Sequence, residues 1–382
     1  MATIIFGSYM VRYPLGGMLS WALQYLVGLK ELGHEVYFVE KYAYQNSCYN
    51  PVSREQSNDC TYGLRVVNAL LDRVGLVNNW CFVESGETYH GISKNKINDL
   101  FKRADLYIEC GAHGSWEEES QSAALRVYID QDPGYTQIKL HRGLGQNMAV
   151  PVYDHYFTIG RNVGQAGNII PTVGIQWKLL YNPVNSNLFT KTAPPRNARY
   201  STVMNWRSYD DVELNGVVYG QKDVEFEKFK HLPGLANVPL EVAVSGIAKS
   251  KAAELRRMGW KIKDAQQVTA SFDSFCNYLT ACKGEFSVCK NGYVATRSGW
   301  FSDKSAAYMA SGRPVVVQDT GFSQHLPVGA GLFAFNGAEE AAHAFEAIEG
   351  NYAWHSEKAQ EVAREYLETK KVLKSFLNEL GI

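Results

Sequence analysis

Residues 297–318 read RSGWFSDKSAAYMASGRPVVVQ, and this stretch contains the local pattern that decides the fold. A polar loop leads into a segment of small residues, which ends at Gly-Arg-Pro before a run of valines. We predict a helix over 303–311 and a buried strand over 313–318, because short apolar runs between turn signals are typical of parallel sheets. A strand-like segment, GEFSV at 284–288, precedes the loop. Strand, loop, helix and strand in this order form the repeating unit of α/β proteins.

The same alternation continues on both sides of this stretch. TIIFGS at 3–8 and EVYFVE at 35–40 are typical of buried strands, and a helical pattern between them opens at Gly16-Gly17 and closes at Gly33. The alternation continues past residue 120, loosens, and restarts with STVMNW at 201–206. Because parallel strands need helical crossovers, we predict an α/β protein with two Rossmann-like domains that face a cleft.

The length of the chain supports this division. A chain of 382 residues is too long for one ordinary core. We place a first domain at 1–185, a second at 186–355, and a C-terminal amphipathic helix within 356–382. Ligands of such sheets bind beyond the carboxyl ends of the strands, so the loops at those ends are the predicted site.

The composition excludes several classes of protein. Lys and Arg number 38 against 39 Asp and Glu, and this balance argues against a nucleic-acid or membrane-surface partner. The seven cysteines form no Cys-x-x-Cys pair, which argues against zinc and favours free thiols in a reducing cytosol. The chain opens on a predicted strand and has no run of 18 apolar residues. We therefore expect a cytoplasmic protein with no metal site and no transmembrane segment.

The loop before the predicted helix at 303–311 has the properties of an anion site. The first N–H groups of a helix lack intrahelical partners and the helix dipole is positive there, which favours phosphate. Gly299 allows close backbone approach, and Ser302 and Ser305 offer hydroxyl groups. Lys304 offers a charge. Alternatively, Ser302 or the adjacent Asp303 merely caps the helix.

The segment MASGRPVVVQDTGFSQHLP at 309–327 resembles the signature of the group-1, family-four glycosyltransferases of the GT-B fold. That signature reads Met-Ala-x-Gly-x-Pro-Val-Val, followed by Asp-x-Gly-Gly. The stretches 14–40, 177–189 and 272–288 resemble other parts of that family in the same order. The resemblance spans most of the chain. It implies a GT-B fold in which the C-terminal helix packs back toward the first domain; alternatively, this helix covers the second sheet.

The chain departs from that family at one important point. The family carries two glutamates, eight positions apart, that hold the transferred sugar and the ribose. Alignment on Gly312 puts Gly299 and Ala307 at those positions. Recognition of the ribose must then come from elsewhere, and Glu285 is a candidate substitute.

The resemblance also implies residues that hold the donor. The Arg and Lys that clamp the donor diphosphate in the family correspond to Arg207 and Lys222. The loop at Gly16-Gly17 faces the donor in the family, so Arg12 and Tyr13 just before it are expected to line the cleft. Read from the residues alone, Gly16-Gly17 is a plain start of a helix.

Three polar residues in strand-end loops of the first domain are candidate catalytic residues. Asp130, which corresponds to a histidine of the family, and Asp132 are placed to act as a base on an acceptor hydroxyl. Alternatively, they form a turn before Pro133-Gly134. His113 in CGAHGSWEE is a candidate for binding the acceptor, the sugar or a proton, and otherwise is a solvated loop residue.

The function implied by the resemblance is transfer of a sugar from a nucleoside diphosphate to an unidentified acceptor. The departing diphosphate develops negative charge, which helix N-termini, Arg and Lys stabilise without a metal. We therefore expect no cofactor besides the nucleotide-sugar donor. Similarity to family four implies that the anomeric configuration is retained, and the missing glutamates weaken that implication.

Three other functions stay open at this point. A nucleotide-sugar epimerase would use the same two-domain frame without an acceptor. An inactive GT-B-like binding or activating subunit would explain the missing glutamates. A dehydrogenase has the least support, because no Gly-x-Gly-x-x-Gly follows the first predicted strand.

Overall fold

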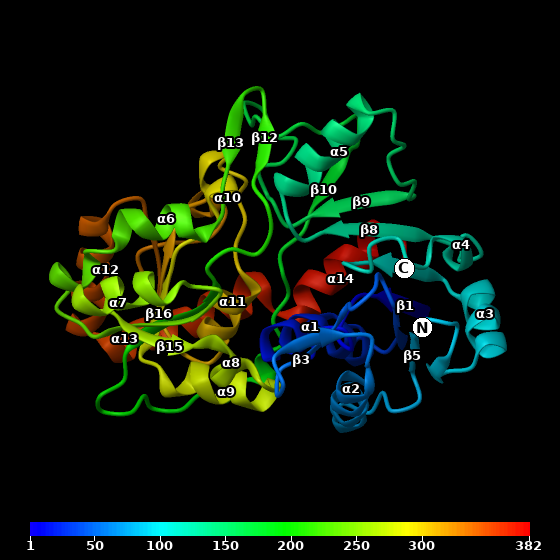
Figure 1. The fold of residues 1–382 in the computed structure, drawn as a ribbon, viewed down its shortest axis with the longest axis horizontal. Helices are drawn as coiled ribbons and strands as arrows, with labels where there is room; N and C mark the ends of the chain where they lie inside the picture. Colours follow the sequence, from blue (N-terminus) through cyan, green and yellow to red (C-terminus); the bar gives the residue numbers. More distant parts are fainter.

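Two sheets form the framework of the protein, and each belongs to one half of the chain (Figure 1). The computed structural model describes residues 1–382. The first sheet has eight strands, all parallel to their neighbours except the edge strand β6. In sheet order these are β10 (Trp177–Leu179), β9 (His155–Thr158), β8 (Arg126–Asp130), β7 (Leu106–Glu109), β1 (Thr3–Gly7), β2 (Glu35–Lys41), β5 (Trp80–Val83) and β6 (Tyr89–Gly91).

Five helices and one hairpin connect these strands. The strands β1, β5 and β7 consist almost entirely of buried side chains, as expected for strands that are covered on both faces. The connections are α1 (Gly16–Glu31), the hairpin of β3 (Cys48–Asn50) and β4 (Glu55–Ser57), α2 (Thr61–Arg73), α3 (Lys94–Arg103), α4 (Glu117–Ser120) and α5 (Tyr135–Gly145).

The second sheet has six parallel strands. In sheet order they are β15 (Lys261–Asp264), β14 (Leu240–Ser245), β11 (Tyr200–Asn205), β16 (Gly284–Ser287), β17 (Val315–Gln318) and β18 (Leu332–Phe335). The strands predicted at 284–288 and 313–318 are β16 and β17, which pair in register. All four residues of β17 are buried, which is why the run reads as continuous valine.

The helices of the second half surround this sheet on both faces (Figure 1). A small hairpin, made of β12 (Val212–Leu214) and β13 (Val217–Tyr219), extends from this half and packs on α5 of the first. The helices are α6 (Lys222–Phe229), α7 (Lys249–Arg257), α8 (Ala265–Thr269), α9 (Phe272–Ala281), α10 (Asn291–Ala295), α11 (Asp303–Ala310), α12 (Ala338–Gly350), α13 (Tyr352–Val362) and α14 (Thr369–Glu379), with short helical turns η1 (Ser186–Leu188), η2 (Leu232–Gly234), η3 (Phe322–Gln324) and η4 (Ala363–Leu367).

The C-terminal segment differs from the single long helix that its amphipathic pattern predicts. The helical path changes at η4 and stops at Glu368, whose backbone is extended, before α14 begins. The reason is a tertiary contact: Val184 donates to the Leu367 carbonyl (2.7 Å) and accepts from Thr369 N–H (3.0 Å). The two chain crossings between the domains therefore lie side by side at Val184 and Glu368.

Helix α14 lies on the first domain, beside α1 (Figure 1). Leu373 and Phe376 are buried in the same apolar core as the α1 side chains Leu23 and Leu26. The protein contains no helix with the length and hydropathy that a membrane crossing requires.

Each sheet contains one point at which the order of the strands reverses its direction along the sheet. In the first sheet β1 lies between β2 and β7, and in the second β11 lies between β14 and β16. Chain connections leave in opposite directions on either side of these strands, so the loops after them diverge and leave a crevice. The two crevices face each other across the gap between the domains.

Candidate functional site

A cavity of about 570 Å³ lies between the two domains. Its walls come from the loop after β1, the start of α1, the carboxyl ends of β11 and β14, and the starts of α6 and α11. This is the position at which α/β sheets bind ligands. Of the residues predicted from the sequence to lie at the site, six line the cavity: Tyr13, Gly17, Lys222, Ser302, Asp303 and Lys304.

Ser302 both caps α11 and lines the cavity. Its backbone is extended and its hydroxyl oxygen accepts a hydrogen bond from Lys304 N–H at 3.2 Å. Ser302 can therefore be a helix cap and a residue of the ligand site at the same time. Ser305, one turn further on, is fully buried and is not part of the cavity wall. Its hydroxyl group has no hydrogen-bond partner. Ser305 therefore does not contact the cavity.

The ammonium group of Lys304 contacts side chains of strands β11 and β16 in the second sheet. Its ammonium group forms an ion pair with Glu285 and donates to Thr202 Oγ1 at 3.0 Å and Ser287 Oγ at 3.2 Å. Glu285 is completely buried beneath Lys304 and is absent from the cavity wall. The suggestion that Glu285 replaces a ribose-binding glutamate is therefore not supported, because its charge is used by Lys304.

Lys222 is the cation of the cavity whose charge is uncompensated. It is the first residue of α6, and its ammonium group makes neither a hydrogen bond nor an ion pair. Burial, together with the nearby charge of Lys304, lowers the pKa of Lys222 to about 8. An ammonium group held without an anion at the wall of a cavity is ready to bind one.

Arg207, the other predicted phosphate ligand, lies elsewhere. Its guanidinium group forms ion pairs with Asp211 and Asp223, both at 2.8 Å, and it does not line the cavity. The reason is local: the first turn of α6 carries Asp223, which draws the guanidinium outward. Arg207 therefore does not lie beside Lys222 in the cavity wall.

Two of the predicted glycines serve packing between the domains. Gly299 has φ +75, and a Cβ there would lie 2.8 Å from the backbone nitrogen of Asn162 in the first domain. At Gly16 a Cβ would lie 2.4 Å from the carbonyl oxygen of Ser271, just before α9. Each glycine permits close contact of two protein segments, and neither lines the cavity.

Asp130 has a structural role at the end of β8. It is fully buried and accepts hydrogen bonds from Thr158 Oγ1 (2.7 Å), Gln137 Nε2 (2.8 Å) and Asp132 N–H (2.9 Å). Burial raises its pKa. The turn predicted as the alternative to a catalytic role is the one that forms, and Asp130 is not in the cavity wall.

Asp132 joins the two domains. It accepts from Lys290 Nζ at 2.9 Å and from the hydroxyl groups of Tyr209 and Tyr293. All three donors belong to the second half of the chain. Lys290 and Tyr293 line the cavity, whereas Asp132 lies behind them. Its oxygens are therefore already bonded and are not directed at an acceptor.

His113 lies at the margin of the cavity. It is exposed, its φ is +57, and its ring stacks on that of Tyr9 with centroids 6.0 Å apart. Tyr9 lines the cavity and His113 does not. The histidine therefore supports a ring of the wall from outside.

The sequence interpretation missed most of the aromatic wall. The rings of Tyr9, Trp21, Tyr49, Tyr293 and Trp300 line the cavity, together with Tyr13, which was expected there. The available signal was the high count of 23 tyrosines and the position of Tyr9 after the first strand. The remaining rings come from separate segments, which only folding brings together.

One group of side chains away from the cavity has the chemistry of a metal site. Donor atoms of Cys60, Glu84 and His90 lie within 4.8 Å of one another, and His90 Nε2 is 2.9 Å from Glu84 Oε2. Burial raises the pKa of the Cys60 thiol to about 11, which opposes the thiolate that metals bind. None of the three lines the cavity.

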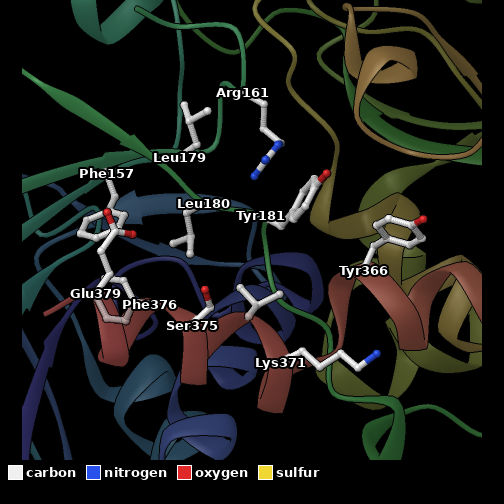
Figure 2. A pocket seen from close by; sticks show the side chains of 11 residues that line it. Phe157, Arg161, Leu179, Leu180, Tyr181, Tyr366, Lys371, Ser375, Phe376 and Glu379 are labelled. Atoms are coloured by element: carbon white, nitrogen blue, oxygen red, sulfur yellow. The ribbon is translucent and has the colours of Figure 1, made fainter. Parts of the chain in front are cut away.

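A second hollow, of about 210 Å³, lies between α14 and the edge of the first sheet (Figure 2). Arg161 points into it and lies over the ring of Tyr181 at 4.1 Å. It shares no lining residue with the cavity between the domains. It lies beside the chain crossings at Val184 and Glu368.

Two Rossmann-like domains that face a cleft, with a terminal helix that returns to the first domain, define the GT-B fold of glycosyltransferases, and this protein has that fold. The predicted fold class and the family resemblance in fold are confirmed. No protein-family model matches the sequence, and no curated protein matches it.

Solved structures with the same fold cover nearly the whole chain. An α-glucosyltransferase in complex with UDP and a 13-mer DNA has 12% identity and a TM-score of 0.60, over 100% of this chain and 99% of that one. AviGT4, a glycosyltransferase involved in avilamycin A biosynthesis, has 11% identity and a TM-score of 0.58, over 99% and 97%. Anabaena Alr3699/HepE in complex with UDP and glucose has 12% identity and a TM-score of 0.55, over 100% of both chains.

Proposed function

We propose that the protein is a glycosyltransferase that moves a sugar from a nucleoside diphosphate to a hydroxyl group of an acceptor. The observation that carries the proposal is the unpaired ammonium group of Lys222 in the wall of the cleft. UDP is bound by Anabaena Alr3699/HepE and by the α-glucosyltransferase that share the fold. A diphosphate is the anion that best satisfies such a cation in a GT-B cleft.

The second domain supplies the groups for the diphosphate. Lys222 provides a full charge, and the start of α11 adds the positive end of a helix dipole. Lys304 is bonded to Glu285, so it acts mainly by holding the start of α11 on the sheet. We assign neutralisation of the leaving diphosphate to Lys222 and to the backbone of α11.

Asp303 is suited to bind a hydroxyl group of the donor. Its side chain lines the cavity at the start of α11, where burial raises its pKa. A carboxyl group in this environment binds hydroxyl groups well and would repel a phosphate placed directly against it. We assign Asp303 to the ribose or to the transferred sugar, in place of the absent paired glutamates.

The mechanism also needs a group that takes the proton of the acceptor hydroxyl. The first-domain wall of the cavity contains no carboxylate or histidine, since Asp130 is buried and Asp132 is bonded to Lys290. In the mechanism that fits, the acceptor oxygen bonds to the anomeric carbon and the bond from that carbon to the phosphate oxygen breaks. The acceptor proton passes to the departing phosphate. Attack on the leaving-group face retains the anomeric configuration.

Calorimetric titration with UDP, GDP, dTDP and ADP tests the donor site. We expect UDP, which neighbours of the same fold bind, to bind here as well, and Lys222→Ala to weaken binding about 10- to 100-fold, the value of a charge-assisted hydrogen bond of about 1.5–3 kcal/mol. Arg207→Ala is the matched control and should bind normally. The proposal is wrong if no nucleotide binds, or if Lys222→Ala leaves the affinity unchanged.

Turnover separates an enzyme from an inactive subunit. A glycosyltransferase given its nucleotide sugar should release the nucleoside diphosphate slowly into water, and faster with an acceptor. Binding without any release would indicate a binding subunit instead. Release of an isomeric nucleotide sugar would indicate an epimerase.

A further inference from the structure

The two walls of the cavity differ in charge. Every charged side chain that lines it belongs to the second domain: Lys222, Lys290, Asp303 and Lys304. The wall from the first domain is uncharged and consists of aromatic, amide, aliphatic and glycine residues. Because the groups assigned to the diphosphate belong to the second domain, we place the acceptor against this first-domain wall.

Charged residues near that wall are compensated inside the protein. Arg12, beside Tyr9 and Tyr13, is buried, and its Nε donates to Glu40 at 2.9 Å. Glu40 is fully buried and also accepts the backbone N–H groups of Met10, Val11 and Arg12. Neither charge reaches the cavity wall. The first domain therefore presents no ionic partner to an acceptor there.

The aromatic rings of this wall are held in place before any ligand binds. The Tyr9 ring packs against Tyr13 and Trp21, with centroids 6.1 and 5.8 Å apart. Tyr13 in turn stacks on Tyr49 at 6.4 Å. The rings are tilted against one another, by 77° for Tyr9–Tyr13 and 54° for Tyr9–Trp21, so the platform they form is a cluster of separate ring faces and edges. Rings that are already ordered lose little conformational entropy on binding.

Hydrogen-bonding groups lie at the edges of these rings. Gln56 Nε2 donates to the Tyr13 hydroxyl at 3.1 Å, and Trp21 Nε1 donates to Gln131 Oε1 at 3.2 Å. Phenol and amide groups can both donate hydrogen bonds to hydroxyl groups and accept hydrogen bonds from them. The negative faces of the rings suit the polarised C–H groups of a flat ligand. The wall thus combines apolar faces with neutral polar edges.

We propose that the acceptor is an uncharged saccharide, bound with the C–H face of a sugar ring on the platform of Tyr9, Tyr13, Trp21 and Tyr49. This inference rests on the proposed function. A polyanion such as nucleic acid is disfavoured, because most of its affinity comes from Lys and Arg contacts with phosphate, and this wall has none.

A glycan array probed with the UDP-saturated protein tests the class of acceptor. We expect bound spots to be neutral oligosaccharides, with sulfated, sialylated and uronic-acid glycans at background. Saturation-transfer NMR with the best neutral glycan should show signals from C–H protons of one ring face. Either a set of bound glycans that is mainly anionic or an array without any bound glycan would overturn the inference.

Variants connect the binding to the platform. Trp21→Ala and Tyr13→Ala should each reduce saccharide affinity at least tenfold and leave UDP affinity within twofold. Tyr13 is only half-buried, so its replacement keeps the test valid if Trp21→Ala fails to fold. Trp354→Ala, an exposed aromatic residue on α13, is the control and should change neither affinity.

The same experiments distinguish two kinds of failure. If UDP binds but an oligonucleotide or a free aromatic alcohol replaces the saccharide, the acceptor inference is wrong and the proposed function stands. If Trp21→Ala and Tyr13→Ala both keep the saccharide affinity of the unsubstituted protein, the platform is not the acceptor site. If no nucleoside diphosphate binds, the proposed function fails, and the inference with it.

Discussion

Lys290 of the second domain donates to Asp132 of the first at 2.9 Å, and both side chains are largely buried at the edge of the cleft. Tyr209 and Tyr293 donate to the same carboxylate. The cluster joins the domains beside the cavity, where opening would separate its members. It therefore holds the two domains together beside the cavity.

Asp132→Asn should weaken domain closure. Hydrogen bonds to a charged group contribute about 1.5–3 kcal/mol, and the amide retains only part of this. We expect a larger radius of gyration in small-angle scattering and a lower kcat/KM. Asp273→Asn removes an exposed ion pair between the domains, Arg73–Asp273, and should have little effect. Equal effects of the two variants would contradict a special role for the cluster.

Binding of the donor should depend on pH through Lys222. The pKa of this residue is lowered to about 8, and the charged form binds phosphate. UDP affinity should therefore fall as the pH rises through 8. Binding should also take up protons near pH 8, which calorimetry in buffers of different ionisation enthalpy measures. Lys222→Arg stays charged and should lose this dependence; a falling affinity that persists in the variant would assign the effect elsewhere.

Lys222 should also reduce the stability of the empty protein. Because its pKa is lowered in the folded state, the unfolded state binds more protons between about pH 8 and the ordinary pKa of lysine. Stability from this group therefore rises with pH across that window. We expect Lys222→Met to raise Tm at pH 7 while weakening UDP binding about as much as Lys222→Ala does. A lower Tm would show that the ammonium group has stabilising contacts in the folded protein.

Lys304 and Glu285 should behave as one unit. Lys304→Met leaves Glu285 buried and without a partner, and breaking a buried pair costs about 3–5 kcal/mol. The double variant Lys304→Met with Glu285→Gln removes both charges and should recover much of that loss in urea unfolding. An additive double variant would show that the two side chains do not interact. Loss of activity in the single variant alone cannot be assigned to phosphate binding.

Gly299→Ala should separate the domains. The added Cβ would meet the backbone of Asn162, and φ is +75. Gly174→Ala is a matched control, because its φ is +77 and no atom lies within 4 Å of its Cβ. The control should lose only the roughly 1–2 kcal/mol of a left-handed alanine. Gly299→Ala should lose more, together with activity, and equal losses would contradict the packing argument.

The alternation of strands and helices could be predicted because its causes are local. The buried run of β17, the polar start of α11 and the helix from Gly16 to Glu31 each follow from the periodicity of a few neighbouring residues. Ser302 could also be placed, since the first residues of helices after parallel strands lie at the same edge of a sheet, whereas Lys222 is assigned through the family resemblance. The interruption at Glu368 could not, because its cause is Val184, far away in the chain.

The candidate site followed from the sequence only in part. Local pattern could indicate that Lys222, Asp303 and Lys304 begin helices, and the structure places them in one cavity. Which charges are free there depends on contacts between distant segments. Arg207 is held by Asp211 and Asp223, Lys304 is bonded to Glu285, and Lys222 is left without an anion. Such pairings depend on distances in space, which only tertiary packing determines. The periodicity of residues along the chain does not indicate them.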